Sequence, residues 1–166
     1  MSWTSSNHGV GVFNPRAFSF GGTSAIVTSV GLIVGLGAAT AAKATIVSGL
    51  LIVAIADNLT DSLSIHMYQE AEQLEEDAAF RTTVANFAMR LLVASTFVLI
   101  TLAVPGGYTV IPTIAWGLLL LSALTYSLAR ARHVGPGREI VKHLAVATVV
   151  VAASYVIGTC LRQYAT

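Results

Sequence analysis

The sequence predicts an all-α membrane protein with five transmembrane helices, in which the second helix extends into a short acidic cytoplasmic helix. Of its 166 residues, 55% are hydrophobic and only 10% are charged, whereas soluble domains carry about 25% charged residues. The mean hydropathy is +0.75. The apolar residues also gather in five segments, each near the length of about 20 residues that crosses a bilayer as a helix. A soluble fold would need more polar residues to cover its surface.

Each apolar segment ends where the sequence changes to charged residues, proline or glycine. Lys43 separates the first two segments, and Pro105 with the two following glycines separates the third from the fourth. Pro112 falls in the first turn of the fourth segment, where a missing N–H costs least. We expect a polar lead-in over 1–22 and a five-helix domain over 23–166. The predicted spans are 25–42, 46–65, 84–104, 110–129 and 144–161.

The basic residues predict the orientation of these spans. Short loops rich in Lys and Arg stay in the cytoplasm, and the fourth loop holds Arg130, Arg132, Arg138 and Lys142. With five spans, the N-terminus and the acidic loop between spans two and three then lie in the cytoplasm, and the C-terminus lies outside. We therefore expect a multi-pass protein of a cell (inner) membrane.

Several function classes are excluded or disfavoured by composition. A net charge of +1 points to no nucleic acid. Cys160 stands alone, so no internal disulfide can form. The sequence contains no phosphate-binding loop, nucleophile elbow or metalloprotease motif. We expect no soluble cofactor and no enzymatic activity.

Two carboxylates inside the second span carry the functional prediction. Asp57 lies near the bilayer midplane, and Asp61 lies one turn closer to the cytoplasm on the same helix face. Charged side chains at this depth are costly and usually face a cavity, a partner or an ion pathway. Two like charges tolerate each other when a cation sits between them or when one is protonated. This pair therefore suits a site that exchanges a metal ion for protons.

Arg90 offers a competing structural role for one of these carboxylates. It enters the third span at a depth similar to that of Asp61, so an Asp61–Arg90 ion pair would neutralise both groups. The sequence shows no comparable partner for Asp57. We leave open whether Asp61 is a metal ligand or the partner of Arg90, and we expect Asp57 to be the main functional carboxylate.

Further candidate metal ligands follow at the cytoplasmic mouth of the second span. The imidazole of His66 suits divalent transition metals and the thioether of Met67 suits softer ones, although residues at a helix end are often only interfacial. A run of acids follows, and we expect it to continue the second helix. Such a run can be a solvated face, or it can raise the local cation concentration. The candidate acidic ligands here are Glu70, Glu72, Glu75 and Glu76.

A small-residue pair in the first span bears on packing. Gly31 and Gly35 form a G-x-x-x-G motif, which lets two helices approach closely. The second helix could belong to the same subunit or to another copy of the chain.

The chain resembles the vacuolar iron transporter family, whose members move ferrous iron or manganese out of the cytosol. The resemblance rests on Ile26-Val27-Thr28-Ser29-Val30-Gly31-Leu32-Ile33-Val34-Gly35, on Asp61-Ser62-Leu63-Ser64-Ile65 before an acidic helix, and on the order of five spans. It implies a homodimer with a metal path near the subunit interface, an acidic cluster that collects metal, and proton-coupled antiport. Ser24 stands where the family usually has Asp, and Ile65 where it usually has Met.

These residues bear on three possible functions from different classes. The predicted one is transport of a divalent cation, Fe²⁺ or Mn²⁺, across the bilayer in exchange for protons. The alternative is a non-transporting scaffold or metal-sensing subunit, in which the acidic helix docks a partner; Ser24 and Ile65 favour it. A membrane enzyme would need a nucleophile and a base within reach, and the sequence offers only scattered His and Asp residues.

Overall fold

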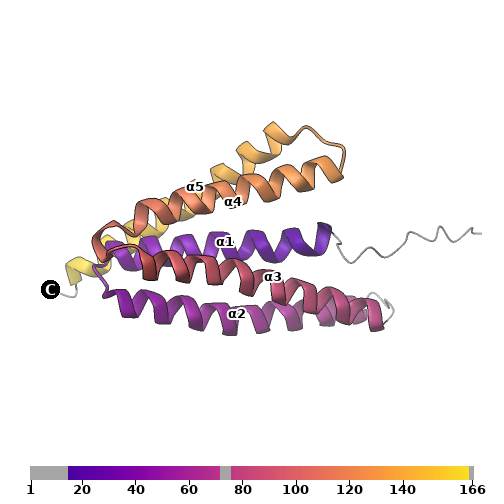
Figure 1. Cartoon of the computed structure of the whole chain (residues 1–166), viewed down its shortest axis with the longest axis horizontal. Helices are drawn as coiled ribbons and strands as arrows, with labels where there is room; N and C mark the ends of the chain where they lie inside the picture. The colour runs from indigo at the N-terminus through magenta and orange to yellow at the C-terminus, as the bar shows by residue number, and fades with distance from the viewer. Residues whose placement is uncertain (1–14, 72–75, 165–166) are drawn as a thin grey trace, which may run out of the picture.

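The computed structural model describes residues 15–71 and 76–164, and these form five long helices joined by short connections (Figure 1). Each of the five is long and apolar enough to cross a membrane, so the predicted fold class is confirmed and the chain has the architecture of an integral membrane protein. A 3₁₀ turn, η1 (Gly106–Tyr108), precedes the fourth helix. The helices are α1 (Pro15–Ala38), α2 (Lys43–Ala71), α3 (Glu76–Ala103), α4 (Val110–Ala131) and α5 (Pro136–Tyr164).

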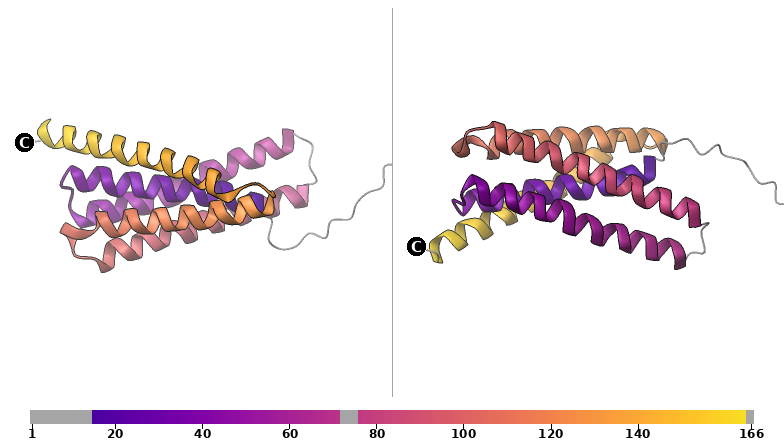
Figure 2. Two further views of the ribbon diagram at one scale, coloured as in Figure 1. Left: turned by 90° about the horizontal axis from the view of Figure 1, so that it is seen from above. Right: turned by 60° about the horizontal axis from the view of Figure 1, so that its bottom comes forward.

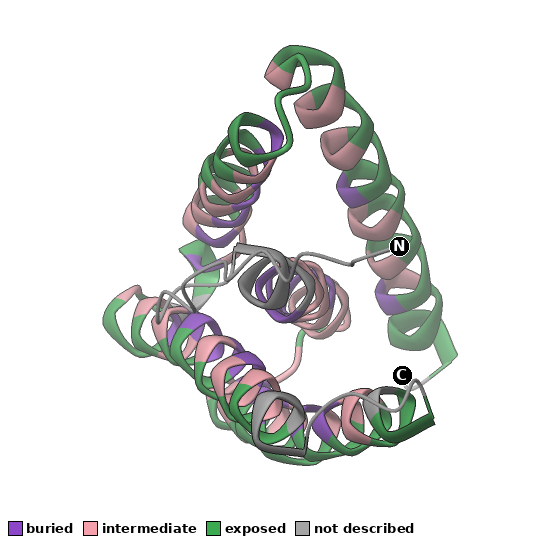
Figure 3. Ribbon diagram, turned by 90° about the vertical axis from the view of Figure 1, so that its right-hand side faces the viewer, coloured by how far each residue is buried: buried purple, intermediate pink, exposed green. Residues whose placement is uncertain are grey.

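The first helix is the centre of the bundle. α1 contacts each of the other four helices, and the end-on view in Figure 3 shows it inside a ring that they form. Half of its span is buried, against 6% of the span in α5. The segment from Gly21 to Ala38 contains no charged residue, and a helix without a polar face is suited to burial on all sides.

The core is formed by apolar side chains from all five helices, with α5 contributing Ala147. Ile33, Leu50, Phe97 and Leu121 are each at most 1% exposed. On α4 the buried residues recur every four positions, which makes a ridge that packs into a groove of a neighbouring helix. Gly117 lies on this ridge, and a Cβ there would overlap the side chain of Val30 on α1. The ridge consists of Thr113, Gly117, Leu121, Thr125 and Ala129.

The G-x-x-x-G pair of α1 is used within the subunit. A Cβ at Gly31 would lie 3.1 Å from Oγ of Ser154, and one at Gly35 would lie 3.3 Å from the Ser154 carbonyl oxygen. Gly158 of α5 lies directly against the Gly35 carbonyl group. Close packing of α1 on α5 therefore accounts for this motif.

Several helix boundaries differ from the predicted spans, including the start of α5, which lies at Pro136 rather than near residue 144. α1 begins at Pro15, so the end of the expected polar lead-in is helical; proline is favoured in a first turn because its missing N–H would have no partner there. The second helix does continue beyond its span, but only to Ala71. Glu76 begins α3, which corrects the expectation that the whole acidic run extends the second helix. Residues 72–75 lie outside the described ranges.

The connections divide between the two ends of the bundle. The starts of α1 and α3, the end of α2 and the α4–α5 connection lie at one end, and the other connections and the end of α5 lie at the opposite end, as Figures 1 and 2 show. The basic loop therefore shares an end of the bundle with the end of α2 and the start of α3. At the opposite end, Lys43 Nζ donates to the carbonyl oxygens of Leu102 and Val104 at 2.7 and 2.9 Å. This side chain satisfies carbonyl groups that the end of α3 leaves without helical partners.

Candidate functional site

The two carboxylates of α2 share one arginine of α3. Arg90 Nη1 donates to Asp61 Oδ2, and Arg90 Nη2 donates to Asp57 Oδ2. The Asp61–Arg90 pair considered from sequence therefore forms. The expectation that Asp57 lacks a comparable partner is wrong, because the two ends of one guanidinium fork reach carboxylates that lie one helical turn apart.

The arginine is buried, whereas its partners lie at the edge of the subunit. Its side chain is 4% exposed, compared with 42% for Asp57 and 29% for Asp61. Two carboxylates and one guanidinium leave a formal charge of −1 within a span. An uncompensated charge inside a transmembrane segment is costly. The group formed by Asp57, Asp61 and Arg90 is called the charge triad below.

A small cavity with both polar and apolar lining residues adjoins the charge triad between α1, α2 and α3. Its volume is about 10 Å³, which is room for about one water molecule. Thr28 and Ser29 of α1 line it together with Asp57, Asn58 and Arg90. The side-chain amide of Asn58 donates to the carbonyl oxygen of Phe87 at 2.9 Å.

The residues expected at the mouth of α2 separate into two groups. His66 Nε2 lies 3.4 Å from Glu70 Oε1, so these two side chains are brought together. Met67 is 61% exposed, and the structure gives it no place in a ligand set. Both His66 and Glu70 are more than one helical turn beyond Asp61 in α2.

The acidic candidates beyond Ala71 can be placed only in part. Glu72 and Glu75 lie outside the described residues. Glu76 is the first residue of α3, but its side chain lies outside the described part of the structure. Within the described ranges, no group of three or more His, Cys, Asp or Glu side chains is arranged to hold a metal ion. Among the described residues, the charge triad is therefore the cluster of ionisable side chains inside the spans that could form a cation site.

Three buried polar residues near the charge triad were not identified from the sequence. Asn58, Ser62 and Asn86 are 1%, 7% and 0% exposed. The signal was present: Asn58, Ser62 and His66 recur every four residues within an apolar span, and Asn86 stands four residues before Arg90. These side chains are uncharged, and an uncharged polar residue inside an apolar span is a weaker signal than a charged one.

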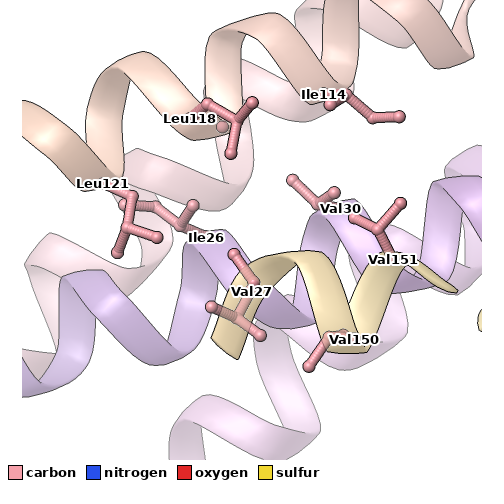
Figure 4. Close-up of a pocket in the computed structure, with 10 residues that line it drawn as sticks. Ile26, Val27, Val30, Ile114, Leu118, Leu121, Val150 and Val151 are labelled. Atoms are coloured by element: carbon pink, nitrogen blue, oxygen red, sulfur yellow. The ribbon is translucent and has the colours of Figure 1, made fainter. Parts of the chain in front are cut away.

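Two other cavities, described next, lack the side chains that would bind a cation. Figure 4 shows a small one between α1, α4 and α5 that is lined by aliphatic side chains such as Ile26, Ile114 and Val151. A groove of about 530 Å³ runs between α1 and α5, and its walls are also almost entirely apolar. Comparison of the chain with protein-family models, with curated proteins and with solved structures finds no match.

Proposed function

We propose that this protein carries a divalent metal cation, of the Fe²⁺ or Mn²⁺ type, across a membrane in exchange for protons and out of the cytosol. The observation that carries the proposal is the charge triad. In it, the buried Arg90 of α3 forms ion pairs with two carboxylates of α2. Ionisable groups inside transmembrane segments are expensive, and they mark ion or proton pathways more often than packing sites.

The charge of the triad supports an exchange mechanism. With Arg90 bound, one negative charge remains, and a proton on either carboxyl group would cancel it. A divalent cation between Asp57 and Asp61 would instead be compensated by both carboxylates, since oxygen ligands of this kind suit hard divalent ions. In the proposal, Arg90 occupies the carboxylates in the metal-free state, and the metal and the proton compete for them.

The exposure of the carboxylates supports access by an ion. Because Asp57 and Asp61 are partly exposed in the single chain while Arg90 is buried, an ion can reach the carboxylates without passing the guanidinium. A carboxylate left facing lipid would be costly. A second copy of the chain covering this face would remove that cost, and the proposal therefore includes the homodimer implied by the family resemblance.

The two ends of the bundle fit the proposed direction. The basic α4–α5 loop favours a cytoplasmic position, and it lies at the same end as the α2–α3 connection. In the proposal, Glu70, Glu72, Glu75 and Glu76 attract the cation on that side, with His66 nearby, and the C-terminus lies outside.

The second candidate function is a non-transporting scaffold or metal-sensing subunit. Arg90 favours it, because a guanidinium that binds both carboxylates could be a purely structural element. The lack of a three-ligand group among the described side chains points in the same direction.

A liposome assay separates the two candidates. The purified protein would be reconstituted with a pH gradient, and uptake of Fe²⁺ and Mn²⁺ would be measured for the wild type, Asp57→Asn and Glu139→Gln. Glu139 is the matched control, because it is a carboxylate with a basic partner, Lys142 at 2.7 Å, at the end of the bundle.

We expect metal uptake that depends on the pH gradient, falls at least about ten-fold in Asp57→Asn and is unchanged in Glu139→Gln. If the folded wild-type protein gives no uptake above that of empty liposomes, transport is refuted and the scaffold function stands. Uptake that is identical in all three proteins would remove Asp57 from the metal site.

A further inference from the structure

The connection between α4 and α5 carries the most strongly basic stretch of the chain. Residues 130–143 contain four Arg or Lys residues and one acid, which gives this stretch a net charge of +3, whereas the whole protein has a net charge of +1. All four basic residues are exposed. These residues, Arg130, Arg132, Arg138 and Lys142, are called the basic turn below.

Backbone hydrogen bonds hold the basic turn in a defined shape. The N–H of Val134 donates to the carbonyl oxygen of Ala129 at 3.0 Å. The N–H of His133 donates to the carbonyl oxygen of Arg130 at 3.2 Å. These two bonds, together with the positive φ of His133, form the Schellman motif that closes many helices. Because α5 then begins at Pro136, the end of α4 and the start of α5 are kept close together.

Acidic side chains neutralise little of the charge on the basic turn. Glu139 Oε1 lies 2.7 Å from Lys142 Nζ, so these two side chains form an ion pair. The ion pairs among the described residues include no carboxylate partner for Arg130, Arg132 or Arg138. Their guanidinium groups are therefore available to an anion from outside the subunit.

The basic turn lies where the apolar parts of α4 and α5 end. No charged residue occurs over 110–129 of α4 or over 144–161 of α5. Tyr126 is 49% exposed and stands one turn inward of Arg130 on α4, and tyrosine is enriched at membrane–water interfaces. Arg and Lys side chains near a helix end extend toward the lipid headgroups. In a bilayer, the exposed guanidinium groups would therefore lie at the level of the lipid phosphates.

The acids at this end of the bundle lie on the other side of α1. The stretch 70–77 contains five acids, and its described parts belong to the end of α2 and the start of α3. Figure 1 shows α4 and α5 on one side of α1 and α2 and α3 on the other. Anionic headgroups are repelled beside the acids and attracted beside the basic turn. The charge distribution at this end therefore favours one place for anionic lipids.

We propose that the basic turn binds the phosphate of anionic phospholipid headgroups, of the phosphatidylglycerol type, from the surrounding bilayer. A guanidinium group can pair with phosphate oxygens through two parallel hydrogen bonds, and clusters of four or more basic residues beside a transmembrane helix suit such headgroups. Arg132 at the end of α4 and Arg138 in the first turn of α5 bind the headgroup together. The lipid thereby links α4 to α5, the helix whose span is the least buried of the five.

Thermal unfolding of the full chain in detergent micelles tests this site. Dioleoyl phosphatidylglycerol, dioleoyl phosphatidylcholine or inorganic phosphate would be titrated into the protein. The rise in melting temperature gives an apparent dissociation constant, because a ligand of the folded state stabilises it according to its concentration and affinity. The variants are Arg132→Gln, Arg138→Gln and the double variant. Arg81→Gln is the matched control, since Arg81 is an exposed arginine at the same end of the bundle, near the start of α3.

We expect phosphatidylglycerol to bind the wild type at least about ten-fold more tightly than phosphatidylcholine. Each single variant should weaken this binding about five-fold and the double variant about twenty-fold, because each basic residue near a membrane surface makes a similar contribution. Arg81→Gln should match the wild type. About 0.5 M NaCl should reduce the preference for phosphatidylglycerol, since salt screens exposed charges. Without lipid, all variants should unfold at the wild-type temperature, because the replaced residues are exposed.

Equal stabilisation by the two lipids would overturn the headgroup site. Binding of phosphatidylglycerol at wild-type strength in the double variant, or an equal loss in Arg81→Gln, would also overturn it. Stabilisation by inorganic phosphate that matches that of phosphatidylglycerol would assign the basic turn to a free anion instead of a lipid. The lipid site does not rest on metal transport, so failure of the liposome uptake assay would leave it standing.

Discussion

The amide oxygen of Asn86 on α3 lies against Gly21 on α1 so closely that a methyl group at position 21 would overlap it. The same methyl group would come within 2.9 Å of Cγ of Arg90. Gly21 therefore makes room for the side chains of both Asn86 and Arg90, the arginine of the charge triad. This contact ties the central helix to the proposed site.

Replacement of Gly21 by alanine is expected to destabilise the protein by about 1–3 kcal/mol, because overpacking forces buried groups apart. Gly49→Ala is the matched control, since a Cβ there would meet only Leu32 and Leu36 side-chain atoms at 3.4–3.5 Å. That change should be neutral or stabilising by up to about 1 kcal/mol, because glycine disfavours helices. Reversible unfolding in mixed detergent micelles measures both, and equal effects would contradict the contact.

Loss of Arg90 is expected to cost much more than loss of either carboxylate. Arg90→Leu leaves two carboxylates uncompensated in a span, where an unpaired charge costs about 2.5–3.5 kcal/mol. Asp61→Asn leaves the neutral Asp57–Arg90 pair and should cost a fraction of that. The same unfolding assay tests the difference. Adding Asp57→Asn and Asp61→Asn to Arg90→Leu should restore most of the lost stability, and failure of this rescue would argue against a charge effect.

The contact of Lys43 with the end of α3 is expected to stabilise the bundle. Lys43→Met removes two hydrogen bonds to carbonyl oxygens, and hydrogen bonds to charged groups make a net contribution of about 1.5–3 kcal/mol each. The control is Lys142→Met, which breaks the exposed pair with Glu139. Exposed pairs contribute at most about 1 kcal/mol. Thermal unfolding of the two variants should rank Lys43→Met as the less stable, and the reverse order would contradict the capping role.

A histidine to glycine change should have opposite effects at two positions. His133, which follows the end of α4, has a φ of 54°, a conformation that costs an L-residue about 1–2 kcal/mol. His133→Gly should therefore raise the melting temperature. His143 lies inside α5, so His143→Gly should lower it, because glycine costs a helix about 1 kcal/mol. If both variants raised the melting temperature, or both lowered it, the backbone conformation of residue 133 would not be the cause.

The amino-acid sequence by itself determined the fold class and the approximate positions of the spans. Length and hydropathy suffice for this, because a bilayer requires about 20 apolar residues in a helix regardless of what the helix packs against. It also identified Asp57, Asp61 and Arg90 as unusual, because a charge inside an apolar span is visible without knowing its neighbours.

Only the tertiary structure decided how these groups meet. The second partner of Arg90, the central place of α1 and the burial of Asn58, Ser62 and Asn86 depend on how each helix is rotated about its axis. That rotation is set by close packing, such as Gly21 against Asn86 and Gly117 against Val30. Sequence spacing gives the face on which a residue lies, but it does not say which neighbouring helix that face contacts. For this reason the sequence offered one candidate partner for the arginine, and the packed helices gave it two.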